Sequence, residues 1–158
     1  MNEQRPGQHA GIGPATDEEV PAYLQALGIP GVIDLHVHFM PDNVLAKVWS
    51  YFDGEAQRTG HPWPISYRLP EAQRVAALED LGVIAYGTLN YAHRPDMAAW
   101  LNEYSRQFAD HHPEAIRSGT FYPEPGAAEL VRAALDDGVQ LFKVHVQVGC
   151  FTPLDPLL

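Results

Sequence analysis

The chain has 158 residues, of which 46% are hydrophobic and 19% charged, a balance typical of a folded globular domain. No apolar run approaches the ~18 residues that a transmembrane helix needs, and the first residues lack the order of a signal peptide, so we expect a cytoplasmic protein without a membrane partner. The formal net charge is −10 and the ten Lys and Arg are scattered singly, which argues against nucleic acid as a partner. The single Cys150 excludes an internal disulfide and a cysteine zinc cluster.

The chain begins with residues 1–15, which are rich in Gly, Pro and polar side chains. We expect a flexible lead-in there, followed by one domain over residues 16–158. Thr16 is placed to cap a first helix, whose first turn is acidic and which Gly28 ends.

Residues 31–39, with the sequence GVIDLHVHF, alternate strictly between apolar and polar side chains. This period of two predicts a strand with two unlike faces. We expect one face to bury its apolar side chains and the other to carry the polar ones, Asp34, His36 and His38. The strand leads through a loop into a helix predicted over residues 41–53.

The rest of the chain alternates predicted strands and helices after an irregular insertion over residues 54–70. Further helices are predicted over residues 70–82, 97–112 and 126–138, and further strands over 83–89, 116–122 and 139–149. Such alternation requires parallel strands joined by right-handed helical crossovers, so the fold class is α/β. Periodicity does not separate an open doubly wound sheet from a barrel, although no glycine-rich nucleotide motif follows any predicted strand.

The pair His36 and His38 is the feature that points to chemistry. Two histidines two residues apart on a strand share a face at roughly 6.5 to 7 Å, close enough for both rings to bind one divalent cation. A chance surface pair among eight histidines is the alternative interpretation. A strand that aims Asp, His and His into a core favours ligand binding, because buried polar groups are costly without a partner.

GVIDLHVHFMP followed by NVLAKVWSYFD resembles the start of amidohydrolase superfamily members, in the amidohydrolase-related group that includes aminocarboxymuconate semialdehyde decarboxylase. DDGVQLFKVHVQVGCFTPLDPLL resembles the fourth strand and following loop of that group, and the resemblance runs from about residue 16 to the end. It implies a (β/α)8 TIM barrel, here about its first four units as a partial barrel. It also implies that His36 and His38 hold a divalent metal, commonly zinc, for hydrolysis or non-oxidative decarboxylation of a small-molecule substrate.

The family pattern needs later residues that this sequence does not match. Histidines on the fifth and sixth strands and an aspartate on the eighth normally complete the ligands and supply the base, so the expected catalytic base lies beyond Leu158. We therefore expect a truncated product or an incomplete record. A catalytically inactive fragment, an assembly module that pairs with a second copy or a complementing C-terminal half, and an open α/β sheet that binds a ligand without metal remain alternatives.

Three further residues are candidates for the same site. Alternation in residues 139–149 places Lys143 and His145 on one face, which we expect to be polar and inward. In some amidohydrolases a lysine on the fourth strand is carboxylated and bridges two metals, whereas the decarboxylase-like group generally uses one metal without it. Lys143 is thus a substrate or structural contact or, alternatively, a metal ligand, and His145 is a candidate substrate contact. Asp34 could orient a ligand histidine or serve a buried structural role.

Overall fold

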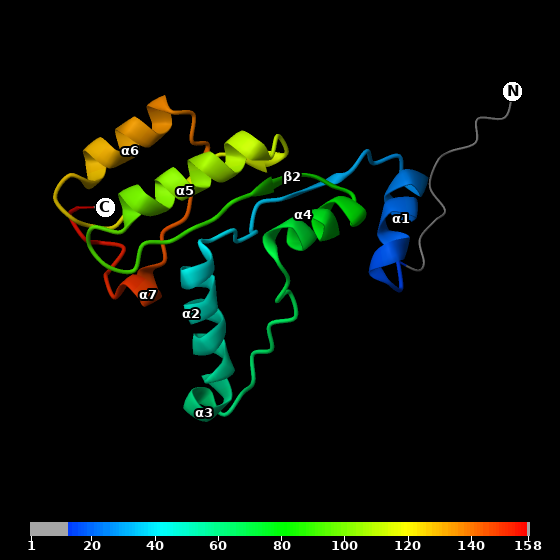
Figure 1. The fold of residues 1–158 in the computed structure, drawn as a ribbon, viewed down its shortest axis with the longest axis horizontal. Helices are drawn as coiled ribbons and strands as arrows, with labels where there is room; N and C mark the ends of the chain where they lie inside the picture. The colour runs from blue at the N-terminus through cyan, green and yellow to red at the C-terminus, as the bar shows by residue number, and fades with distance from the viewer. Residues whose placement is uncertain (1–12, 158) are drawn as a thin grey trace, which may run out of the picture.

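The computed structural model describes residues 13–157 (Figure 1). The predicted lead-in over residues 1–15 therefore lies largely outside the described residues. The elements follow in the order η1 (Asp17–Glu19), α1 (Val20–Ala26), β1 (Val32–Asp34), α2 (Asp42–Asp53), α3 (Glu55–Thr59), α4 (Glu71–Asp80), β2 (Val83–Gly87), α5 (Ala98–His111), β3 (Ala115–Ile116), β4 (Ser118–Gly119), α6 (Ala127–Asp136), β5 (Leu141–Phe142) and α7 (Val146–Gly149).

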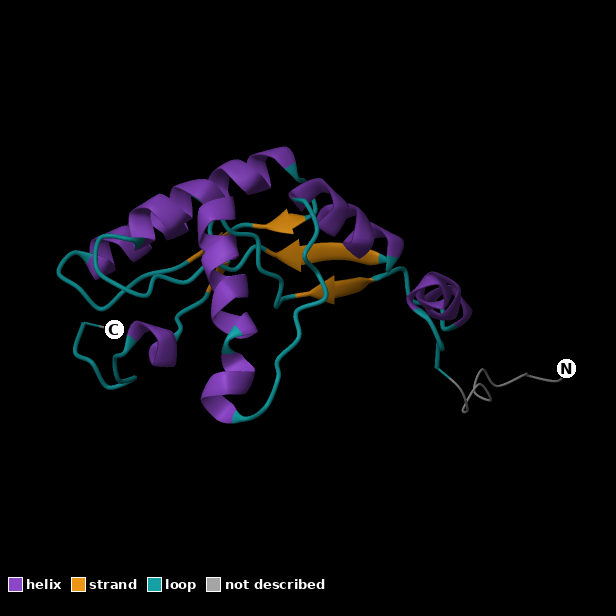
Figure 2. Cartoon of the chain, turned by 60° about the horizontal axis from the view of Figure 1, so that its bottom comes forward, coloured by secondary structure: helices purple, strands orange, loops and turns teal. Residues whose placement is uncertain are grey.

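The strands pair in parallel, as the alternation of strands and helices predicts. β2 lies between β1 and β3, with Val83 opposite Val32 and Tyr86 opposite Ala115. A second sheet consists of β4 and β5. Only Arg117 separates β3 from β4, so one extended segment takes part in both sheets. Helices cover one side of the strands (Figure 2).

The predicted partial (β/α)8 barrel is wrong. Within residues 13–157 the strands form open parallel sheets of three and two strands, and no closed sheet is present. Alternating strands and helices dictate parallel pairing through helical crossovers, but closure also requires a matched strand number, tilt and stagger around the whole ring. The pairing here is too short and too interrupted for that, since four of the five strands have only two or three residues.

The strand predicted over residues 31–39 ends early, at Asp34. Asp34 Oδ1 accepts a hydrogen bond of 2.9 Å from the backbone N–H of His36, a local bond that competes with strand pairing. The predicted burial of the apolar face is wrong for Ile33 and Leu35, which are 59% and 54% exposed, whereas Val37 is partly buried against the core. Leu35 lies just beyond the end of β1, and the described residues leave both of these side chains uncovered.

The strand predicted over residues 139–149 is also shorter than expected. Pairing continues to Lys143, whose N–H donates to the carbonyl of Gly119 at 3.0 Å. His145 then caps α7, because its ring Nδ1 accepts the N–H of Val148 at 3.4 Å. Helix α7 ends at Gly149 and is followed by Cys150, whose φ of 55° is left-handed. Lys143 and His145 were expected on one face of a single strand, but the strand pairing ends before His145.

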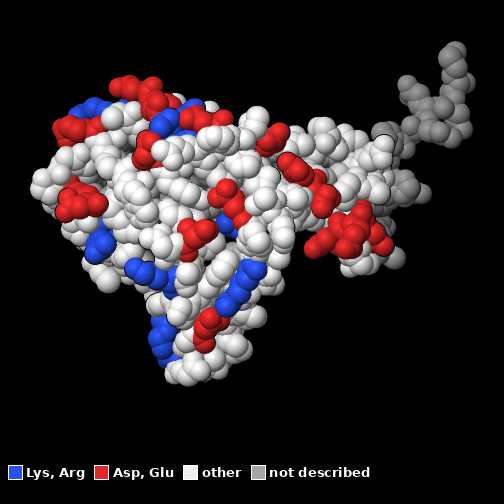
Figure 3. Space-filling view, viewed as in Figure 1, with Lys and Arg blue, Asp and Glu red and all other residues white. Residues whose placement is uncertain are grey.

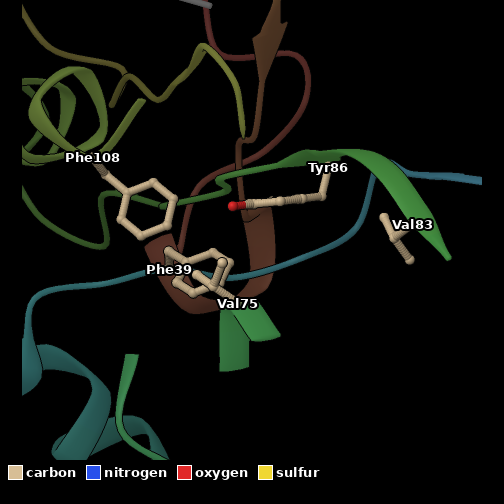
Figure 4. Packing of buried hydrophobic residues seen from close by; sticks show 5 residues of the cluster. All are labelled: Phe39, Val75, Val83, Tyr86 and Phe108. Carbon is tan, nitrogen blue, oxygen red and sulfur yellow. The ribbon is translucent and has the colours of Figure 1, made fainter. Parts of the chain in front are cut away.

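A cluster of buried apolar side chains joins the sheet to helices α4 and α5. Phe39 is fully buried, and its ring stacks on Phe108 at a centroid distance of 4.4 Å and lies 5.6 Å from Tyr86. Val75 of α4 and Val83 of β2 complete the cluster (Figure 4). Phe39, the residue directly after His38, therefore anchors the segment that follows β1 in the core.

Charged side chains of both signs are mixed over the face shown in Figure 3, with acidic groups over the end that holds η1 and α1 and basic groups along the projection formed by α2 and α3. On that projection Arg58 pairs with Glu55, and Arg68 pairs with Asp53. None of the helices in the described part of the chain is both long and apolar enough to cross a bilayer.

Candidate functional site

The site begins with the short extended segment that follows β1. Leu89, just beyond β2, makes two hydrogen bonds to this segment. The N–H of Leu89 donates to the carbonyl of Val37 at 2.8 Å, and the carbonyl of Leu89 lies 3.0 Å from Nδ1 of His38. This segment therefore continues alongside the β2 segment even though β1 ends at Asp34. The backbone and the ring of His38 are both tied to the same residue.

The hydrogen bond to Leu89 determines the tautomer of His38. A carbonyl oxygen can only accept, so Nδ1 of His38 carries the hydrogen and Nε2 keeps its lone pair when the ring is neutral. Burial, helped by the charges of His36, Lys143 and His145, lowers the pKa of His38 from 6.5 to about 4, against the opposing effect of the Leu89 carbonyl. His38 is thus neutral at pH 7, the form that binds a metal ion.

His36 lies next to His38, with a ring centroid distance of 5.2 Å and an interplanar angle of 61°. Its Nε2 is 3.3 Å from Nζ of Lys143, which is 107 positions away along the chain. A lysine ammonium can only donate, so this contact uses the lone pair of His36 Nε2. Both histidines therefore have Nε2 available as an acceptor.

His145 reaches the same place from the segment after β5. The ring of Tyr91 lies 5.9 Å from that of His38 and 5.1 Å from that of His145, so Tyr91 connects the two histidines. Because Nδ1 of His145 accepts the Val148 N–H, its Nε2 carries the hydrogen in the neutral ring. His145 thus suits donation to a substrate oxygen better than metal ligation through Nε2. Burial lowers its pKa and raises that of Tyr91.

The structure brings together four of the five residues singled out from the sequence, His36, His38, Lys143 and His145, here named the His36 cluster. The fifth, Asp34, contacts the backbone N–H of His36 rather than its ring. Tyr91 was missed, although it follows β2 as the histidines follow β1, and the same reasoning from strand ends would have found it.

Two buried polar residues that the sequence pattern did not single out hold the histidine segment from behind. Arg74 of α4 donates from Nη1 to the carbonyl of His38 at 3.0 Å, and Asn90 donates from Nδ2 to the carbonyl of Phe39 at 3.0 Å. Neither residue belongs to a motif: Arg74 lies in a helix predicted from apolar spacing alone, and Asn90 directly follows the strand predicted over residues 83–89. Their role follows only from the tertiary structure.

The His36 cluster fits a divalent metal in part. Two imidazoles that present Nε2 as an acceptor, that of His38 fixed by a backbone carbonyl and that of His36 in contact with Lys143, are the kind of donor pair and support that zinc prefers. However, residues 13–157 contain no group of three or more His, Cys, Asp or Glu side chains placed to hold a metal ion. The described residues thus supply a pair of ligands, and further donors would have to come from Lys143, His145, a substrate or another chain.

A separate pocket of about 360 Å³ lies between α5 and α6 and shares no residue with the His36 cluster. Its charged side chains already have partners. Arg106 is bound to Glu103 at 2.7 Å, and Arg117 is bound to Asp110 and to Asp137. Paired surface charges leave little driving force for a ligand, so the His36 cluster is the better candidate site.

No protein-family model, no curated protein and no solved structure matches the chain. The assignment of a function therefore depends on the residues of the site themselves.

The lowered pKa of His38 has a consequence for stability that can be measured without metal. Between pH 6.5 and about 4 the unfolded chain binds a proton at His38 that the folded chain does not, so the free energy of unfolding is expected to fall as the pH is lowered through this range. Urea denaturation at pH 7 and pH 5 in the presence of a chelator checks this, and His38→Gln should weaken the pH dependence whereas His61→Gln, at an exposed position, should not. An NMR titration that gives His38 a pKa near 6.5 would contradict the expectation.

Proposed function

We propose that the His36 cluster is a divalent-metal centre, with zinc as the simplest occupant, that serves the hydrolysis of a small-molecule substrate. The main support is that candidate residues from two distant segments lie close together: Nζ of Lys143 is 3.3 Å from Nε2 of His36, although 107 positions separate the two residues in sequence. The resemblance to the amidohydrolase-related group suggests the same chemistry. The open α/β sheet described above, rather than a barrel, carries this site.

Each residue has a distinct part in this proposal. His36 and His38 are the metal ligands, and the Leu89 carbonyl keeps His38 in the tautomer that exposes Nε2. The metal, when bound, would supply Lewis-acid activation of water and of the substrate. Lys143 provides a positive charge next to the ligands, where negative charge develops during hydrolysis of an acyl group, and His145 can donate from Nε2 to a substrate oxygen.

Decarboxylation of a small carboxylic acid is a second candidate for the same site. The observation that favours it is the position of Lys143, a half-buried residue whose Nζ lies 3.3 Å from His36 Nε2 and could pair with a carboxylate. Hydrolysis and decarboxylation would use the same metal ligands, so only the product separates them. Release of CO2 from a panel of small aromatic and aliphatic acids tests the second, and hydrolysis of 4-nitrophenyl acetate tests the first.

Zinc titration of the purified, chelator-treated chain tests the metal centre. We expect the His36→Ala/His38→Ala double variant to bind zinc at least ~100-fold more weakly than the unaltered chain, because even the loss of supporting groups around a ligand commonly costs 10- to 100-fold. The matched control is His61→Ala/His111→Ala, which removes two exposed histidines and should bind zinc normally. The same double variant should lose the zinc-dependent reaction.

Two outcomes would overturn the proposal. Equal zinc affinity of the two double variants would show that the metal binds elsewhere, and absence of zinc binding by the folded, unaltered chain would exclude the metal centre. Because two protein ligands bind zinc more weakly than three, the titration should include a carboxylate such as acetate, which can supply a further donor.

A further inference from the structure

Arg74 is a buried cation that has no anionic partner within residues 13–157. It is 7% exposed, and among the described residues it forms no ion pair with a carboxylate. Its guanidinium carbon lies 4.7 Å from the centroid of the Phe39 ring, and its Nε has no hydrogen-bond partner in the described part of the chain. Burying a charge without a counter-ion is costly, so the interactions that Arg74 does make are of interest.

The hydrogen bond that Arg74 makes is directed at a residue of the site. Nη1 donates to the carbonyl of His38 at 3.0 Å, and a hydrogen bond from a charged donor is stronger than one between neutral groups. The carbonyls on either side are held as well, that of Val37 by the N–H of Leu89 and that of Phe39 by Asn90. Three successive carbonyls thus have a donor each, and the central one is tied to α4 through Arg74.

This arrangement fixes the peptide plane that follows the Cα of His38. Because the His38 carbonyl and the buried Phe39 beyond it are held, a change in ψ of His38 would swing its Cβ and ring about the Cα–C bond, away from the Leu89 carbonyl that lies 3.0 Å from Nδ1. It would also change the direction of Nε2, the atom assigned above to the metal. Groups that orient a ligand in this way are a regular part of metal sites.

We infer that Arg74 is a positioning residue for His38: through the His38 carbonyl it holds the backbone in the orientation that directs Nε2 into the His36 cluster. This inference rests on the proposed metal centre for its functional meaning. It goes further by assigning a purpose to a buried unpaired charge on a helix that contributes no ligand. The geometric part of the inference is testable whether or not metal binds.

The test compares Arg74→Met, which keeps the length and most of the packing of the side chain but loses the donors, with Arg74→Lys, which keeps a positive charge and N–H donors. Val75→Ala is the matched control. Val75 is the next residue of α4, is buried in the apolar core cluster that contains Phe39, and makes no hydrogen bond to His38. Zinc affinity, the free energy of unfolding in urea and the imidazole ¹⁵N shifts of His38 are measured for each under conditions in which the chain is fully folded.

Arg74→Met is expected to weaken zinc binding by roughly 10-fold or more and to shift His38 from the Nδ1–H tautomer toward a mixture. Arg74→Lys should recover part of both effects. Val75→Ala should lower stability but leave the zinc affinity and the His38 shifts unchanged. A purely structural role for Arg74 would lower stability alone, so unchanged His38 shifts and zinc affinity in folded Arg74→Met would overturn the inference.

Failure of the proposed function gives a different result. If the unaltered chain binds no zinc, the metal centre is excluded, while the ¹⁵N shifts of His38 in Arg74→Met still decide whether Arg74 sets the orientation and tautomer of that ring. If the unaltered chain binds zinc and Arg74→Met binds it equally well, with unchanged His38 shifts, the metal centre stands and the inference about Arg74 is wrong.

Discussion

Replacing Phe39 by alanine is expected to lower the free energy of unfolding by about 3 to 5 kcal/mol, the range found for aromatic-to-alanine changes in cores. Phe39 is fully buried, stacks on Phe108 at 4.4 Å and lies below the guanidinium of Arg74. Its removal therefore leaves a cavity and also takes away the aromatic face that helps to accommodate a buried charge. Urea denaturation followed by far-UV circular dichroism measures the loss.

Phe39→Leu provides the graded comparison. Leucine fills most of the space but lacks the ring face, so the loss of stability should be less than half of that in Phe39→Ala. A loss below ~1 kcal/mol in Phe39→Ala would contradict the burial and packing described for this residue. Because Phe39 directly follows His38, we also expect the alanine variant to broaden the NMR signals of the His38 ring.

The helices could be predicted well from the sequence. α2, α4, α5 and α6 lie within the predicted ranges, because each has apolar side chains at helical spacing that pack on a sheet or on another helix. α3 was missed because the predicted insertion over residues 54–70 lacks such spacing. Only five residues form α3, and local hydrogen bonds such as that of Thr59 Oγ1 to the Glu55 carbonyl support it.

The strands were harder to predict, since alternation indicates which side chains could share a face but not where pairing stops. At β1 the Asp34 carboxylate takes the N–H of His36, and at β5 the His145 ring takes the N–H of Val148. Both bonds form between a side chain and a nearby backbone group, which is the competition that shortens regular strands. The prediction of a closed barrel was wrong for a related reason. Closure depends on the number, tilt and stagger of all strands together, which no local sequence pattern indicates.

The candidate site was predictable in its members but not in its support. Alternation along two predicted strands that were expected to face a barrel interior suggested His36, His38, Lys143 and His145 as one group, and the structure brings them together although it forms no barrel. The Leu89 carbonyl that sets the tautomer of His38 belongs to the backbone and has no signature in the sequence. Arg74 was equally hidden, because an arginine in an amphipathic helix is ordinarily expected to face solvent.

Replacing Asn90 by leucine is expected to destabilise the fold by about 2 to 4 kcal/mol, although the two side chains are similar in size. Asn90 is fully buried, and its Nδ2 donates to the Phe39 carbonyl at 3.0 Å and to Ser105 Oγ at 2.8 Å. Leucine leaves both acceptors in the core without this donor, at roughly 1 to 3 kcal/mol for each. Loss of Oδ1, which has no hydrogen-bond partner among the residues that the structure describes, offsets a part of that cost.

Asn43→Leu is the matched control, because Asn43 is exposed on α2 and the same change there should alter the free energy of unfolding by no more than ~0.5 kcal/mol. A double-mutant cycle with Ser105→Ala identifies the cause. Removing both Asn90 and Ser105 deletes one of the abandoned acceptors, so the double variant should be more stable than the sum of the single losses implies. Strictly additive losses would show that Asn90 acts through packing alone, and that the carbonyl of Phe39 needs no donor from this side chain.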